Sequence, residues 1–141
     1  MKALRGAQAS LLSVLGNRAA DAAPEARMLF GDLACVQLAV GDITEFPEPR
    51  DFAYCEYVDG EVPRIVVSPR LAEQDRGRVL GVLAHEYGHA AMFLVGQIEH
   101  EEREADAAVR ALFGLTIRYD DGDVQTVDPR TPSRPRPDYL G

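Results

Sequence analysis

The start of the chain has the hydrophobic spacing of an amphipathic helix. Leu4, Leu11, Leu12 and Leu15 fall on one face when the chain is drawn with 3.6 residues per turn. Polar residues interrupt this run, whereas a secretory signal peptide needs an unbroken apolar segment at that point. The pattern therefore predicts a structural helix over residues 3–20 and disfavours a cleaved signal.

The next segments mix helical and strand-like patterns. A short helix is expected over residues 24–29, because its first residue is a proline, which suits the first helical turn. Residues 33–40 are apolar and compatible with a strand. Residues 52–58 alternate aromatic with small or polar side chains, an Asp-Gly pair follows at 59–60, and residues 64–68 are again strand-like. This order predicts a β-hairpin.

After Pro69 the hydrophobic period becomes helical. A broad apolar stripe predicts a mostly buried helix that ends at Gly96. The stripe consists of Val79, Leu80, Leu83, Tyr87, Ala90, Ala91 and Leu94. A tight turn would then send the chain back antiparallel into a second helix over residues 101–113, which Gly114 would end. Residues 115–119 are typical of one last short strand.

These elements predict a small α+β domain. A short twisted sheet precedes the buried helix, and a following helix packs antiparallel to it. The chain has 141 residues, enough for one domain with its own core. We expect that domain to span residues 1–128. In residues 129–141 prolines alternate with arginines, which predicts an extended, flexible tail.

Composition narrows the class of function. A net charge of −8 argues against binding to nucleic-acid phosphates, and no stretch has the apolar length of a membrane span. The two cysteines, Cys35 and Cys55, lack the Cys-x-x-Cys spacing of a thiolate zinc site. We expect two buried, reduced thiols, with one disulfide or a metal-capping thiolate as alternatives. This favours a cytoplasmic protein, with secretion as the alternative, and no nucleic-acid or membrane partner.

The buried helix carries the sequence His85-Glu86-Tyr87-Gly88-His89. Side chains four residues apart share a face of a helix, so the two imidazoles point to a common position. This is the H-E-x-x-H arrangement, in which two histidines bind zinc and the glutamate is the general base. Burying two imidazoles and a carboxylate in an apolar helix without a metal would be costly. The motif therefore predicts a Zn²⁺ site.

A peptidase zinc needs a third protein ligand and an open position for water. The start of the returning helix is acidic and can turn its side chains back towards the histidines. Glu102 is the favoured third ligand. His100, Glu101 and Glu104 are the alternatives.

The histidine helix followed by Glu102-x-x-Ala105-Asp106 resembles the gluzincin clan of metallopeptidases, in particular the compact ImmA/IrrE-type peptidases. The resemblance covers residues 52–113 and includes a strand before the histidine helix. It implies a zincin-like fold, with His85, His89 and Glu102 as the zinc ligands. It also implies that Asp106 supports one ligating imidazole, preferably His85, since a carboxylate on the second ring nitrogen fixes the tautomer.

The predicted activity is that of a zinc-dependent endopeptidase acting on a protein or peptide, with Glu86 as the base that activates water. Pro63 cannot donate to a β-ladder, which places the strand after it at a sheet edge. Ile65, Val66 and Val67 would then pair with the main chain of the substrate.

The sequence leaves the donor for the oxyanion open among Tyr54, Tyr119, Tyr139 and Arg118. Tyr87 is expected to pack in the core. Two alternative functions stay open: a catalytically silent zinc-binding domain that acts through a protein partner, and a secreted peptidase or toxin.

Overall fold

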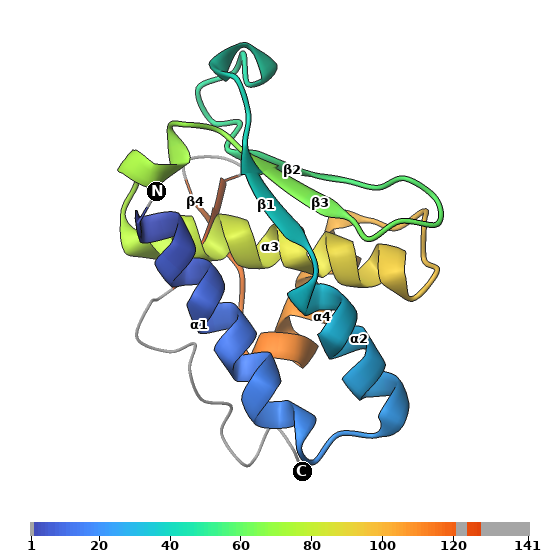
Figure 1. Cartoon of the computed structure of the whole chain (residues 1–141). Coiled ribbons are helices and arrows are strands. Elements are labelled where there is room, and N and C mark those ends of the chain that lie inside the picture. Colours follow the sequence, from blue (N-terminus) through green and yellow to red (C-terminus); the bar gives the residue numbers. More distant parts are fainter. Residues whose placement is uncertain (1, 121–123, 128–141) are drawn as a thin grey trace.

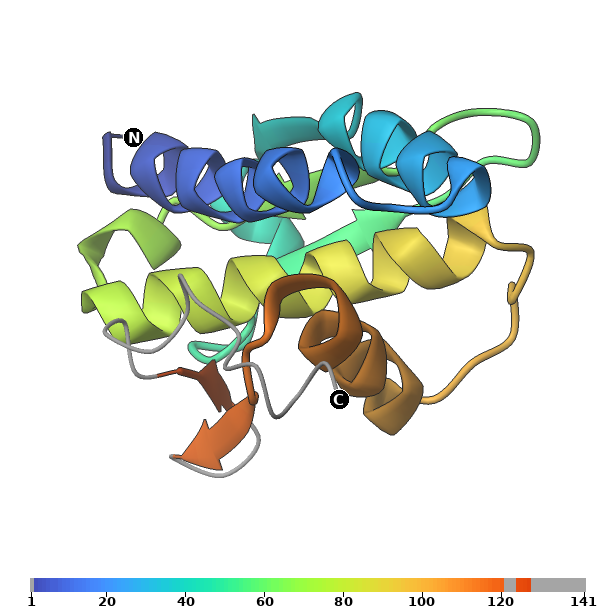
Figure 2. The ribbon, with the colours of Figure 1, turned by 90° about the horizontal axis from the view of Figure 1, so that it is seen from below.

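The long helix α3 (Arg76–Leu94) is the centre of the protein. The fold is known from a computed structural model, which describes residues 2–120 and 124–127. Within these residues α3 contacts three other α-helices and strands of both sheets. Figure 2 shows α1 (Lys2–Ala19) and α2 (Pro24–Ala34) on one side of α3, and α4 (Glu102–Phe113) on the other. The architecture is α+β, as predicted.

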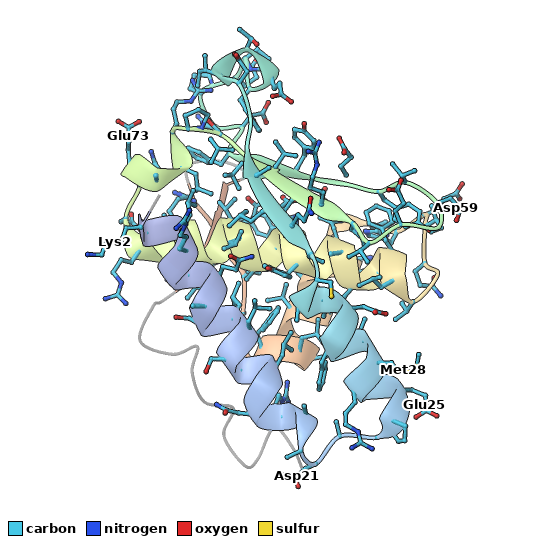
Figure 3. All side chains as sticks on the ribbon, viewed as in Figure 1. Lys2, Asp21, Glu25, Met28, Asp59 and Glu73 are labelled. Carbon is cyan, nitrogen blue, oxygen red and sulfur yellow. The ribbon has the colours of Figure 1, made fainter. Side chains whose placement is uncertain are left out.

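The main sheet has three strands in the order β1-β3-β2 and lies along α3 (Figure 1). Strand β1 (Gln37–Val40) runs parallel to β3 (Arg64–Val67), whereas β2 (Ala53–Glu56) runs antiparallel to β3. The predicted pairing of the two hairpin strands is confirmed, with Tyr54 opposite Val66. Figure 3 shows Asp59 at the tip of the connecting loop, pointing away from the molecule.

Strand β3 is the central strand, so the prediction that residues 64–68 form a sheet edge is wrong. Its residues Ile65, Val66 and Val67 are buried, with 0–3% of each exposed. A continuous Ile-Val-Val run that is buried on both faces is typical of an interior strand, and this pattern outweighs the preceding proline. Pro63 itself lies outside the ladder, because β3 begins one residue later.

Helix α2 continues to Ala34, beyond its predicted end at residue 29, and this shortens the expected strand 33–40 to β1. Leu33 is fully buried on the inner face of the helix. Short apolar runs fit a helix face as well as a strand, so the pattern alone did not distinguish them. Cys35 is consequently the exposed C-cap of α2, and the prediction that it is buried is wrong.

The first helix and the two helices of the site lie where they were predicted. Helix α1 buries Leu4, Leu11 and Leu15 against the core. Helix α4 ends at Gly114, whose φ of +72° is the left-handed conformation that glycine adopts readily. Short helices η1 (Ile43–Glu45) and η2 (Leu71–Glu73) connect elements of the main sheet and α3.

The second sheet pairs β4 (Arg118–Asp120) with β5 (Val124–Thr126) in antiparallel orientation. The predicted tail over residues 129–141 lies outside the described residues. Within the described part of the chain, no helix combines the length and hydropathy of a membrane span.

Candidate metal centre

Helix α3 presents His85 and His89 on the face that α4 covers. The helix begins with an N-cap at Asp75, whose side chain accepts a hydrogen bond from the Arg78 backbone N–H at 2.8 Å. Gly88, between the two histidines, lies so close to α4 that a Cβ there would overlap the carbonyl oxygen of Ala105. The missing side chain therefore brings α4 close to the histidine face.

Three ligand atoms converge at this face: Nε2 of His85, Nε2 of His89 and Oε2 of Glu102. The two nitrogens are 3.0 Å apart, and the carboxylate oxygen lies 2.6 Å from His85 and 2.9 Å from His89. His85 is buried, whereas the Glu102 side chain is 70% exposed. The group is thus closed on the core side and open to solvent on the other.

Asp106 binds the other ring nitrogen of His85, as predicted. Its Oδ1 lies 2.7 Å from Nδ1 of His85, and its Oδ2 accepts a hydrogen bond from the Tyr119 hydroxyl. Because an ionised carboxylate only accepts, Nδ1 of His85 carries the proton. When the ring is neutral, the lone pair is then on Nε2, the atom that faces the ligand group.

The three rival ligands have other partners. Nε2 of His100 lies 2.7 Å from Nδ1 of His89, on the side away from the ligand group. Glu101 and Glu104 form the capping box of α4, in which the Glu104 side chain accepts from the Glu101 N–H at 3.1 Å. Of the four candidates, Glu102 is the residue that the structure brings to both imidazoles.

The donor set fits a Zn²⁺ ion. With neutral imidazoles, two nitrogen lone pairs and a carboxylate oxygen face one another within 3.0 Å, an arrangement that a cation stabilises. A tetrahedral zinc with bonds of about 2.0–2.1 Å separates its ligand atoms by about 3.4 Å, so binding would require each pair to open by about 1 Å or less. Two histidines and one carboxylate are a ligand set of catalytic zinc sites, which keep a fourth position open.

Burial sets the protonation of two groups here. It raises the pKa of Glu86 to about 7, against the smaller opposing effect of His85, so this carboxyl can take up and release a proton near neutral pH. Burial, together with the neighbouring His85, lowers the pKa of His89, which keeps that imidazole neutral and able to ligate.

A cavity of about 430 Å³ opens over the ligand group. The cavity is lined by His85, Glu86, His89 and Glu102, and also by residues 50–55, which include most of β2. Strand β2 pairs only with β3 among the described strands, so the other edge of β2 is free to pair with an added strand. The edge beside the candidate site is therefore β2 rather than the predicted β3.

Cys55 also lines this cavity, half-buried on β2. Burial raises the pKa of its thiol, with a further contribution from the charge of Glu86, so the thiol stays protonated at neutral pH. It does not belong to the group of converging ligand atoms among the described residues. The alternative of a metal-capping thiolate is thus not supported by the geometry, and both cysteines are free rather than paired.

The candidate oxyanion donors are spread over the molecule. Tyr54 donates its hydroxyl to Glu45 at 2.7 Å, and Tyr119 donates to Asp106. Arg118 is exposed on β4, outside the cavity wall, and Tyr139 lies outside the described residues. Of the three that the structure describes, Tyr54 alone lines the cavity.

Tyr87 is fully buried, as predicted. It packs edge-on against Phe113 with ring centroids 6.2 Å apart, and its hydroxyl accepts a hydrogen bond from Gln8 at 3.1 Å. The residue between the two histidines thereby ties α3 to α1 and α4.

Comparisons with known proteins add no relative: no family model, curated protein or solved structure matches this chain.

Proposed function

We propose that the protein is a zinc-dependent peptidase that hydrolyses peptide bonds of a protein substrate. The observation that carries this proposal is the convergence of His85, His89 and Glu102 next to the buried carboxyl of Glu86, at the base of an open cavity. Glu86 supplies none of the three converging ligand atoms. Metal binding alone therefore does not account for a buried carboxyl group at the cavity wall.

When bound, zinc would lower the pKa of a water molecule and polarise the carbonyl of the scissile bond. Glu86 accepts the proton of the attacking water and delivers it to the departing amine. Asp106 keeps the proton of His85 on Nδ1, so that His85 remains a neutral ligand throughout. The core packing behind His85 and Glu86 excludes water from that side.

The free edge of β2 is the place where a substrate would bind. An extended peptide adds to a sheet edge through main-chain hydrogen bonds, and the edge of β2 borders the same cavity as Glu86. Such binding places a backbone carbonyl beside the metal site with little dependence on the side chains of the substrate.

The motif that resembles the ImmA/IrrE-type peptidases supports the same proposal, because Glu102 lies with the two histidines and Asp106 contacts His85. By analogy, a regulatory protein would be the substrate. The free thiols of Cys35 and Cys55 are compatible with a reducing compartment such as the cytoplasm.

The test compares the zinc-loaded protein with its Glu86→Gln variant. Both are incubated with a lysate of the source cell, and new protein termini are mapped by mass spectrometry. We expect equal zinc content, and new termini whose rate of formation falls by about 10²–10⁴-fold in the variant. Glu73→Gln is the matched control, because Glu73 is an exposed glutamate on η2, away from the cavity. Equal cleavage by Glu86→Gln, or no new termini with the parent protein, would contradict the proposal.

A further inference from the structure

His100 lies at the end of the connection between α3 and α4, immediately before the capping residue of α4. Its two ring nitrogens both have partners. Nδ1 lies 2.7 Å from the backbone carbonyl oxygen of Gln97, and Nε2 lies 2.7 Å from Nδ1 of His89. His100 therefore stands between a main-chain carbonyl and one of the proposed metal ligands.

When the rings are neutral, these contacts favour one arrangement of the protons. A carbonyl oxygen only accepts, so Nδ1 of His100 donates its proton to Gln97. The unprotonated Nε2 of a neutral His100 then accepts from Nδ1 of His89. His89 is left with its lone pair on Nε2, which is the atom that faces His85 and Glu102.

The surroundings hold His100 in this position. Gly96, with φ of +87°, turns the chain after α3, and the Gln97 N–H donates to the Met92 carbonyl at 2.9 Å. The carbonyl that orients His100 is thus fixed by the end of α3. The Phe93 ring packs edge-on against His100, with ring centroids 5.0 Å apart. Tyr57 in turn stacks on Phe93, with ring centroids 4.8 Å apart.

We propose that His100 is a positioning residue: through the chain Gln97 carbonyl–His100–His89 it fixes the tautomer and the ring orientation of the second metal ligand. This inference rests on the proposed metal site. His85 has Asp106 for the same task, so each imidazole of the pair has its own partner, one a carboxylate and the other a neutral histidine. The connection between α3 and α4 thereby becomes part of the metal site without supplying a ligand.

The first test reads the tautomers directly. The chain has three histidines, and all of them are in this network, so each ring is assigned from single substitutions. In long-range ¹H–¹⁵N spectra of the full chain, at a pH where the rings are neutral, we expect His89 to carry its proton on Nδ1 in both the zinc-free and the zinc-loaded protein. A zinc-free parent protein with the His89 proton on Nε2 overturns the proposal without any substitution.

The second test removes the acceptor. In His100→Leu we expect the Nδ1–H form of zinc-free His89 to lose its dominance, and the zinc affinity, measured by competition with a chromophoric chelator, to fall by about 10–100-fold. His100→Gln retains an acceptor oxygen and should recover part of both signals. Gln97→Ala is the matched control, because it removes the side chain but keeps the carbonyl that His100 uses.

An unchanged His89 tautomer together with zinc affinity within twofold of the parent in His100→Leu would overturn the role of His100. The tautomer is read without substrate or cleavage, so this result is separate from the outcome with Glu86→Gln. A protein that cleaves nothing would contradict the peptidase, and the spectra would still decide the role of His100.

Discussion

Asp106 accepts hydrogen bonds from both the imidazole of His85 and the hydroxyl of Tyr119. Its removal would leave Nδ1 of a buried histidine without a partner and free the ring to rotate or change tautomer. We expect Asp106→Ala to lower zinc affinity by about 10–100-fold in a chelator competition titration. Asp106→Asn should retain most of the affinity, because its amide oxygen can still accept the proton of His85.

Asp32→Ala is the control for this substitution. It removes the same charge from an exposed position on α2, so any effect of net charge alone on zinc affinity would appear there as well. Zinc affinity within twofold of the parent in Asp106→Ala would show that His85 needs no such support.

At the scale of single residues, the sequence predicted contacts that depend on helical spacing. His85 and His89 share a face because they are four residues apart, and Asp106 lies one turn after Glu102 for the same reason. The partner of His100 was not predictable in this way. It depends on the path of the connection between the helices, and a histidine at a helix start looks the same in sequence whether solvated or bonded.

At the scale of elements, the approach of α4 to α3 at Gly88 sets the geometry of the site. A methyl group there would overlap the Ala105 carbonyl and lie 2.9 Å from a methyl carbon of Val109. We expect Gly88→Ala to push the helices apart, to lower the free energy of unfolding by about 1–3 kcal/mol, and to weaken zinc binding, because Glu102 moves with α4. Urea denaturation and the chelator titration measure the two effects.

Gly16→Ala is the matched control, since a Cβ at Gly16 on α1 meets no atom within 4 Å. Alanine is the better helix former, so this variant should be as stable as the parent or more stable by up to about 1 kcal/mol. If Gly88→Ala and Gly16→Ala had the same free energy of unfolding and the same zinc affinity, the site would not depend on the close packing of α4 on α3 at Gly88.

The elements themselves were largely predictable, but the order of the strands was not. Local patterns identified the paired strands β2 and β3. The segment of β2 alternates in side-chain character, the segment of β3 is a run of apolar residues, and turn residues separate the two. Which of them forms the edge depends on β1, which arrives from a distant part of the chain and pairs parallel to β3. The proline before β3 suggested an edge, and long-range pairing decided otherwise. As a result the proposed substrate edge is β2 rather than β3.

At the scale of the whole molecule, α3 carries both the core and the site. The same helix buries Leu83 and Tyr87 in the hydrophobic core and presents His85 and His89 to the cavity. The predicted buried helix was correct because its apolar stripe is broad. Its central place between two helical layers (Figure 2) follows from packing among distant segments, which periodicity does not encode. A metal bound by His85 and His89 would thus be directly coupled to the stability of the fold.

This coupling predicts that zinc raises the melting temperature of the whole domain. A ligand that binds only the folded state stabilises it by about 2.7 kcal/mol when its free concentration is 100-fold above Kd. For a chain of this length that corresponds to an increase in Tm of about 9 °C, measured by calorimetry with and without Zn²⁺. Mg²⁺ at the same concentration should have little effect, because it prefers all-oxygen sites. Glu102→Gln should lose most of the increase, since it removes the anionic ligand, whereas Glu99→Gln, an exposed glutamate of the same connection, should keep it. An equal zinc-dependent increase in Glu102→Gln would place the metal elsewhere than between α3 and α4.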